Sequence, residues 1–142
     1  MNINPSFSPN VGRPPIRLLL IEDHSELAEI TAEILCSYGM DVRIASSGQE
    51  AIETAPVFTP EIILCDLFLW DMSGLDLARA FRSKPETKDA VIALYTALRD
   101  MELSTLEGEA NSTEIDLFLS KPLTGEKVDK LFARFALRRQ QG

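Results

Sequence analysis

Residues 62–82 of the chain read IILCDLFLWDMSGLDLARAFR. The opening run, IILCD, is short and apolar until Asp66, as expected for a strand buried on both faces of a parallel sheet. After a loop, apolar residues recur at helical spacing over residues 75–82, at Leu75, Leu77, Ala78 and Phe81. The stretch therefore predicts a buried strand, a loop and an amphipathic helix, with a carboxylate where the strand ends.

The same strand-and-helix unit recurs on both sides of this stretch. Short apolar runs predict strands at residues 16–21 (IRLLLI), 42–45, 91–96 (VIALYT) and 117–120. Helices are predicted after residue 24, ending at Gly39 in a left-handed conformation, over residues 47–57, and near the C-terminus, where Val128, Leu131, Phe132 and Phe135 form one face. Residues 99–116 are expected to hold a fourth helix, although their apolar stripe is weak. Strands alternating with helices indicate an α/β fold with a parallel sheet covered on both faces.

The length of 142 residues fits one domain. Residues 1–15 carry four prolines and few large apolar groups, so we expect a flexible leader, followed by a single domain over residues 16–140. Lys121 stands 142 − 121 = 21 residues before the last residue, which is enough for one helix. No further output domain is therefore expected.

The composition excludes several classes of protein. A net charge of −8 argues against binding to a nucleic-acid backbone, which requires Lys and Arg to neutralise phosphates. Arg134, Arg138 and Arg139 are interpreted as a solvated helix end. Cys36 and Cys65 lie in apolar segments and are expected to be buried and reduced. With neither a signal peptide nor an apolar run long enough to cross a membrane, the chain is predicted to be soluble and cytoplasmic.

Five polar residues stand where predicted strands end. They are Glu22, Asp23, Asp66, Thr96 and Lys121. In a parallel α/β sheet the ligand site lies outside the carboxyl ends of the strands, so these residues are expected to meet at one edge. Three carboxylates gathered there would repel one another unless a cation intervened. A hard divalent ion such as Mg²⁺, bound through oxygen, meets that requirement.

The same set suits phosphoryl transfer. A carboxylate such as Asp66 can act as a nucleophile and form an aspartyl phosphate. A metal ion and Lys121 can offset the charge on the transferred group, and the Thr96 hydroxyl can hydrogen-bond to it. Each residue alone would more often be a helix cap or a solvated side chain. Five of them at one edge of one sheet favour the functional interpretation.

Several segments together resemble the receiver domain of bacterial response regulators across residues 17–138. They are LLLIEDH, ASSGQEAI, IILCDLFLWDMSGLDLARAFR, VIALYTA and LFLSKPL. The resemblance implies a flavodoxin-like, doubly wound (βα)5 fold with a five-stranded parallel sheet in the order 2-1-3-4-5. It also implies a cis peptide bond between Lys121 and Pro122.

Site roles follow from the resemblance, position by position. Asp66 is the implied phosphoacceptor, and the implied metal ligands are Glu22, Asp23, Asp66 and the backbone carbonyl of Phe68. Lys121 would hold the phosphoryl group, with Mg²⁺ or Mn²⁺ as the cofactor. Thr96 resembles the hydroxyl of the activation switch, and Phe118 resembles the aromatic residue whose rotamer follows it.

The implied function is that of a stand-alone response regulator. It would accept a phosphoryl group on Asp66 from a phosphohistidine of a histidine kinase or a histidine phosphotransfer protein, lose it by Mg²⁺-dependent autodephosphorylation, and signal by binding a protein target. It would not be an ordinary turnover enzyme. A pseudo-receiver that binds partners without phosphorylation is the alternative. A phosphatase of the haloacid dehalogenase type is disfavoured, because it needs a second acid where this chain has Phe68.

Three positions near the predicted site invite separate interpretation. Trp70 stands where the family commonly has proline, and it is either a partner anchor or a local packing residue. Phe68 and Leu98 are apolar and are predicted to flank the phosphoryl pocket, where they would impede attacking water. His24, the single histidine, is expected to be a solvated loop residue rather than a metal ligand.

Overall fold

The structure is a computed structural model that describes residues 14–98, 102 and 114–141. Residues 1–13 of the expected leader, and nearly all of the segment expected to hold the fourth helix, lie outside these ranges, so both stay predictions. Strands and helices alternate along the described chain in the order β1 (Arg17–Ile21), α1 (Ser25–Ser37), β2 (Asp41–Ala45), α2 (Gly48–Phe58), β3 (Ile62–Asp66), α3 (Gly74–Arg82), β4 (Val91–Thr96), β5 (Leu117–Ser120) and α5 (Gly125–Gln141).

The strands form one parallel sheet in the order β2-β1-β3-β4-β5. This order confirms the predicted flavodoxin-like α/β fold. The chain moves outward from β1 to β2 and then returns to the other side of β1 as β3. The carboxyl ends of β1 and β3 therefore flank the point where the strand order reverses, which is where open α/β sheets bind their ligands.

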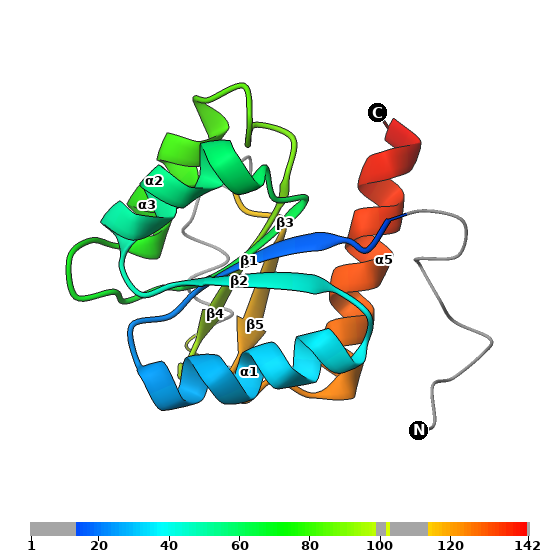
Figure 1. Cartoon of the computed structure of the whole chain (residues 1–142), viewed down its shortest axis with the longest axis horizontal. Helices are drawn as coiled ribbons and strands as arrows, with labels where there is room; N and C mark the ends of the chain where they lie inside the picture. The colour runs from blue at the N-terminus through cyan, green and yellow to red at the C-terminus, as the bar shows by residue number, and fades with distance from the viewer. Residues whose placement is uncertain (1–13, 99–101, 103–113, 142) are drawn as a thin grey trace.

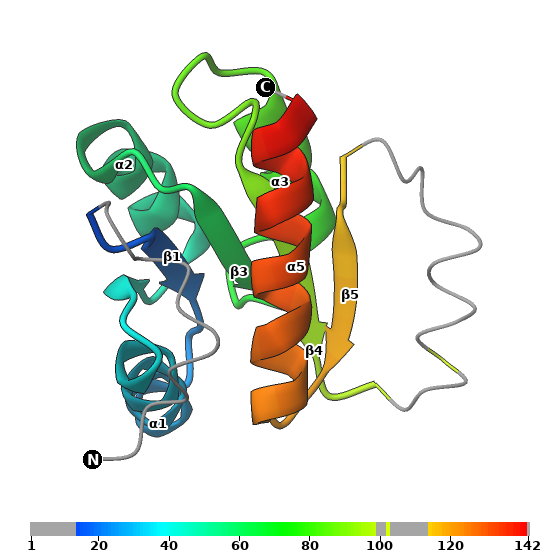
Figure 2. The ribbon, with the colours of Figure 1, turned by 90° about the vertical axis from the view of Figure 1, so that its right-hand side faces the viewer.

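Helices cover both faces of the sheet. In Figure 1, α2 and α3 lie on one side of the strands, and α1 and α5 lie on the other. Figure 2 shows α5 in front of β4 and beside β5. Because both faces are covered, β3 and β4 are buried along their whole length, which explains their nearly continuous apolar sequences.

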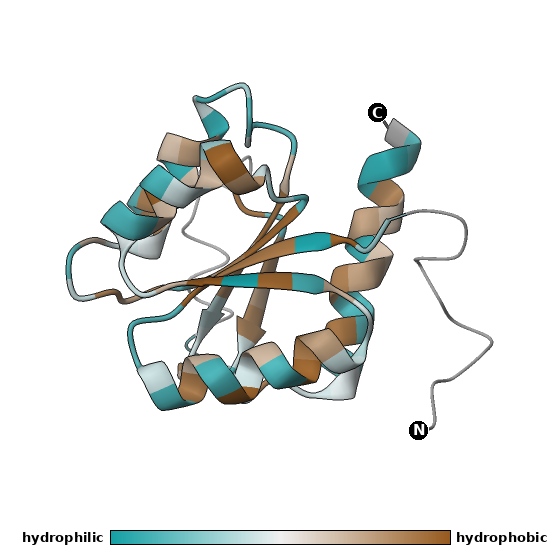
Figure 3. Ribbon diagram, in the orientation of Figure 1, coloured by the Kyte–Doolittle hydropathy of each residue, from teal (hydrophilic) through white to brown (hydrophobic). Residues whose placement is uncertain are grey.

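The sheet separates two hydrophobic clusters of buried residues. Alternate residues of each central strand point to opposite faces, so Leu18 and Leu20 join the cluster beneath α1 and α5, whereas Leu19 and Ile21 join the cluster beneath α2 and α3. Figure 3 shows strands that are mostly hydrophobic between helices in which hydrophobic and hydrophilic residues alternate. Burial of these side chains is the main favourable term for the fold.

Local sequence signals account for the helix ends. Gly39 follows α1 with a φ of 87°, as predicted for a left-handed residue that ends a helix. Ser47 and Ser73 are the N-caps of α2 and α3, and their side chains accept hydrogen bonds from Glu50 N and Leu75 N. The boundaries of the predicted strands and helices agree with the structure to within one residue wherever both were given.

Two expectations are wrong. Cys65 is buried, but Cys36 is exposed, because it lies on the outer face of α1 next to the buried Leu35. The arginines near the C-terminus are not simply solvated: Arg138 Nη2 lies 2.7 Å from both carboxylate oxygens of Asp116, and Arg134 Nη2 lies 3.4 Å from Oδ1. Asp116 comes just before β5, and the sequence pattern gave no sign of this pairing.

Candidate functional site

The strand order brings the predicted polar residues together. Glu22 and Asp23 follow β1, Asp66 ends β3 and Thr96 ends β4, while Lys121 follows β5. These four strands are consecutive neighbours in the sheet, with Asp66 opposite Tyr95 and Thr96 opposite Ser120. The expected gathering of polar residues at one edge of the sheet is therefore present.

Three carboxylates form an acidic pocket at this edge. One oxygen from each of Glu22, Asp23 and Asp66 lies within 4.8 Å of the others, and this is the group in the described chain with a spacing that suits a metal ion. Glu22 is 2% exposed and Asp66 is 7% exposed, whereas Asp23 is the most open to solvent. Hard oxygen donors with one solvent-facing side match what Mg²⁺ requires.

Lys121 supplies a positive charge between two of these carboxylates. Its Nζ lies 2.7 Å from Glu22 Oε1 and 3.1 Å from Asp66 Oδ2, and 5.1 Å from the centre of the Tyr95 ring. Burial by itself would lower the pKa of Lys121, but the contacts with Glu22 and Asp66 raise it overall. The ammonium is therefore held in its charged form beside Glu22 and Asp66.

Backbone N–H groups fix the other carboxylate oxygens. His24 N donates to Glu22 Oε2 at 3.1 Å, Trp70 N donates to Asp23 Oδ2 at 2.9 Å, and Phe68 N donates to Asp66 Oδ1 at 3.1 Å. A carboxylate offers about four lone-pair sites, so each group keeps sites for another ligand. Backbone N–H groups of the loops that follow β1 and β3 therefore orient the three carboxylates.

A close approach between backbones sets the position of Asp66. Gly74 N donates to Leu67 O at 2.7 Å. A Cβ at Gly74 would lie 2.5 Å from the Asp66 carbonyl oxygen and 3.0 Å from Leu67 Cα, both of which are backbone atoms. Only glycine therefore lets α3 begin this close to the end of β3.

The predicted switch residues lie on one face of the sheet. Leu94 pairs with Phe118 and Thr96 pairs with Ser120, so the side chains of Thr96 and Phe118 both point toward the cluster beneath α2 and α3. Thr96 is 1% exposed and accepts from Leu98 N at 3.4 Å, while Phe118 is half-buried. Their roles as switch residues stay a prediction.

A pocket of about 330 Å³ opens beside Asp66 and Lys121. The side chain of Phe68 at its rim is 64% exposed. The expectation that Phe68 and Leu98 flank the site is confirmed, whereas the Phe68 carbonyl as a metal contact stays a prediction. The pocket is lined by Asp66, Phe68, Thr96, Ala97, Leu98, Glu102 and Lys121.

Sequence reasoning missed the hydrogen bonds that support the site. His24 is exposed, as expected for a loop residue, but its Nδ1 also caps α1 by accepting from Leu27 N at 3.2 Å. Asp71 accepts from Gly48 N and Gln49 N at 2.9 and 3.0 Å, and the first of these bonds is the main cause of the lowered pKa of Asp71. The two Asp71 bonds join the loop after β3 to the start of α2. The partners are more than 20 residues apart in the chain, so short-range sequence patterns do not reveal them.

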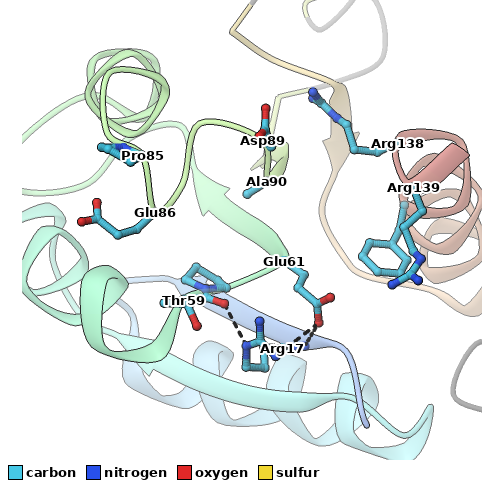
Figure 4. Close-up of a pocket in the computed structure, with 11 residues that line it drawn as sticks. Arg17, Thr59, Glu61, Pro85, Glu86, Asp89, Ala90, Arg138 and Arg139 are labelled. Carbon is cyan, nitrogen blue, oxygen red and sulfur yellow. Dashed lines mark hydrogen bonds and ion pairs between the residues drawn. The ribbon is translucent and has the colours of Figure 1, made fainter. Parts of the chain in front are cut away.

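A second pocket, of about 350 Å³, opens at the opposite edge of the sheet (Figure 4). Its walls carry charges of both signs, with Glu86 and Asp89 facing Arg138 and Arg139 across the opening. Arg17 is already paired with Glu61 at 3.8 Å and donates to Thr59 O at 2.8 Å. The charged groups of this pocket are thus partly engaged with one another, and its described residues form no cluster of three carboxylates like the one formed by Glu22, Asp23 and Asp66.

Comparison with known proteins decides the family. The family model described as "Response regulator receiver domain" matches residues 18–133. The chain belongs to the response regulator receiver family. The predicted receiver fold is thus confirmed, and so is the cis bond between Lys121 and Pro122. Within the described residues, no helix combines the length and the apolar character that a membrane span requires.

Individual relatives agree with this assignment. The chain is 31% identical over 129 residues to the cell cycle transcriptional regulator CtrA of Caulobacter vibrioides, covering 89% of this chain and 52% of that protein. It spans about half the length of the curated relatives it matches. A putative response regulator from Chloroflexus aurantiacus superposes with a TM-score of 0.75 at 28% identity, covering 86% of this chain and 98% of the other.

A third comparison concerns the fold alone. The response regulator TrrA of Thermotoga maritima, solved in complex with Mg²⁺-BeF, superposes with a TM-score of 0.72 at 24% identity. The match covers 84% of this chain and 98% of that protein.

Proposed function

We propose that this receiver accepts a phosphoryl group on Asp66 from a phosphohistidine and signals by binding a protein partner. The observation that carries the proposal is the position of Lys121, whose Nζ bonds both Asp66 and Glu22. An ammonium there offsets the charge of a phosphoryl group on Asp66. The donor would be a histidine kinase or a histidine phosphotransfer protein, in keeping with the family.

The reaction is a transfer between two nucleophiles. A carboxylate oxygen of Asp66 forms a bond to phosphorus as the bond from phosphorus to the donor imidazole nitrogen breaks, and the electron pair of that bond stays on the nitrogen. Lys121 then bonds an oxygen of the transferred group, and the Thr96 hydroxyl can turn to donate to another. Dephosphorylation occurs when water attacks phosphorus and the bond from phosphorus to the Asp66 oxygen breaks, which releases inorganic phosphate and leaves the carboxylate free.

The acidic pocket fits a divalent metal ion. Glu22, Asp23 and Asp66 would hold it, with the Phe68 carbonyl as a further contact. Mg²⁺ or Mn²⁺, when bound, would offset the charge that builds up on the phosphoryl oxygens. This choice of cofactor rests on the three carboxylates, one oxygen from each of which lies within 4.8 Å of the others.

The output is proposed to be a protein contact. Thr96 and Phe118 share a face of the sheet, so movement of the Thr96 hydroxyl toward the phosphoryl group would open space for the Phe118 ring. A net charge of −8 disfavours direct contact of this region with nucleic acid. A stand-alone role, an intermediate place in a relay and a cytoplasmic location stay part of the proposal.

Acetyl phosphate with Mg²⁺ tests the proposal, with intact-protein mass spectrometry as the readout. We expect the wild-type protein to gain the mass of one phosphoryl group, and Asp66→Asn to gain none. Chelation of the metal should prevent the gain. A wild-type protein that stays unmodified, or an Asp66→Asn variant that gains the same mass, would favour the pseudo-receiver alternative.

A further inference from the structure

Lys127 lies in the first turn of α5 and directs its charged group back toward the preceding loop. Its Nζ lies 2.6 Å from Ser120 O, 3.1 Å from Ser120 Oγ and 3.0 Å from Pro122 O. An ammonium has three N–H donors, so these contacts use its full capacity. All three acceptors belong to the two residues that flank Lys121.

The backbone of Lys121 is thereby held from two sides. Lys121 N donates to Thr96 O at 2.7 Å, which continues the pairing of β4 with β5. The carbonyl groups before and after Lys121 are both held by Lys127. The Cα of Lys121 is fixed by contacts with a neighbouring strand and with α5.

A fixed Cα matters because the Lys121 side chain is long and has many rotamers. Its Nζ must reach Glu22 and Asp66 at the same time, at 2.7 and 3.1 Å. Ordering such a side chain costs conformational entropy, and a displacement of about 1 Å in an active site can cost about 100-fold in rate. A loop that moved would place the ammonium less accurately.

Helix stability does not explain a lysine at this position. A positive charge in the first turn of a helix is opposed by the helix dipole. Lys127 is half-buried, and its Nζ contacts lie outside α5. Its bonds therefore serve the loop more than the helix.

We propose that Lys127 is a positioning residue that holds Lys121 in place to bind the phosphoryl group. This role rests on the proposed phosphorylation of Asp66. Lys127 does not touch the acidic pocket itself, so its loss should weaken the binding of a phosphoryl group and leave the metal site intact.

Beryllofluoride mimics a phosphoryl group bound to a carboxylate. Its binding can therefore be measured separately from the binding of Mg²⁺. The full chain would be titrated first with Mg²⁺ alone and then with beryllofluoride at saturating Mg²⁺, by calorimetry, for the wild type and three variants. Lys127→Met keeps the side-chain length and loses the donors. Lys127→Gln keeps one donor group and is the milder change. Lys130→Met is the matched control, since Lys130 is exposed one turn further along α5.

We expect Lys127→Met to bind beryllofluoride about tenfold more weakly while its Mg²⁺ affinity stays within about twofold of the wild type. Lys127→Gln should fall between these two proteins, and Lys130→Met should match the wild type. Equal beryllofluoride affinity in Lys127→Met and the wild type would overturn the role of Lys127, as would a parallel loss of Mg²⁺ affinity in Lys127→Met. A wild-type protein that binds no beryllofluoride would overturn the proposed function, and this role with it.

Discussion

Trp70 donates its backbone N–H to Asp23 Oδ2 across 2.9 Å, which ties the loop after β3 to the end of β1. Proline, the residue common in the family at this position, has no N–H and could not form this bond. The side chain of Trp70 is 76% exposed beside the acidic pocket. The Asp23 carboxylate is therefore bonded directly to the backbone of the single tryptophan in the chain.

Mg²⁺ binding should change the fluorescence of Trp70. A metal ion at Asp23 alters the carboxylate to which Trp70 is bonded, so the emission should change in a saturable way during a Mg²⁺ titration. Asp23→Asn should weaken the apparent Mg²⁺ affinity by at least about tenfold, because one of three carboxylates is lost. Glu33→Gln on the outer face of α1 is the control and should titrate like the wild type. An Asp23→Asn curve that coincides with the wild type would exclude Asp23 as a ligand.

Lys121→Met should separate metal binding from phosphorylation. Without the ammonium, Glu22 and Asp66 lose the cation that offsets their charge, so Mg²⁺ affinity should rise. Phosphorylation by acetyl phosphate should nevertheless slow by about 10²–10³-fold, the usual cost of losing one donor to a developing charge. Calorimetry measures the Mg²⁺ affinity, and the rate of mass gain measures phosphorylation. If both fall together, Lys121 acts by holding the pocket in shape.

Phe68→Asn should shorten the lifetime of the phosphorylated state. The exposed phenyl ring lies at the rim of the pocket over Asp66, and an amide in its place could hold a water molecule for attack on the aspartyl phosphate. We expect dephosphorylation, followed by loss of phosphoryl mass after removal of acetyl phosphate, to become several-fold faster. Val57→Asn, at a site 79% exposed on α2, is the control. A Phe68→Asn time course that matches the wild type removes water exclusion as the role of this ring.

The acidic edge could be predicted from the sequence because parallel topology leaves little choice. Apolar runs identify the strands, and every strand of a parallel sheet ends at the same edge, so Asp66, Thr96 and Lys121 had to meet. The polar partners that orient them could not be predicted. Trp70 bonds Asp23 through the backbone, and Lys127 bonds carbonyl groups, so neither contact depends on a recognisable pair of side chains.

The contacts of Asp116, at the other edge of the sheet, likewise could not be predicted from the sequence. Residue spacing says where a helix is amphipathic, but not which distant carboxylate its arginines reach. Arg138 stands 22 positions from Asp116 and Arg82 stands 34 positions from it. These separations exceed the range of any helical or strand pattern, so the sequence did not show that Arg134 and Arg138 of this cluster pair with Asp116.

The network around Asp116 should make stability depend on pH. The side chain of Asp116 is 8% exposed, and it accepts from Ile92 N at 2.9 Å and from Arg82 Nη2 at 2.8 Å, besides its bonds with Arg138. Burial would raise the pKa of Asp116, but the hydrogen bond from Ile92 and the contacts with Arg138 and Arg82 hold it below its ordinary value of 3.8. A carboxyl group with a lower pKa in the folded state stabilises the fold above that ordinary value, and this contribution is lost as the pH falls through the folded-state pKa.

Asp116→Asn should therefore lower the free energy of unfolding at pH 7 by about 1–3 kcal/mol, because Arg82 and Arg138 lose their charged partner in a half-buried setting. The difference from the wild type should shrink below about pH 4, where the wild-type carboxylate begins to be protonated. This difference in the free energy of unfolding is measured by urea unfolding at several pH values, with circular dichroism as the readout. Asp129→Asn, at an exposed position of α5, should change stability little at any pH. A difference between Asp116→Asn and the wild type that is constant from pH 3 to pH 7, on the order of the same 1–3 kcal/mol, would show that shape rather than charge at Asp116 stabilises this edge of the sheet.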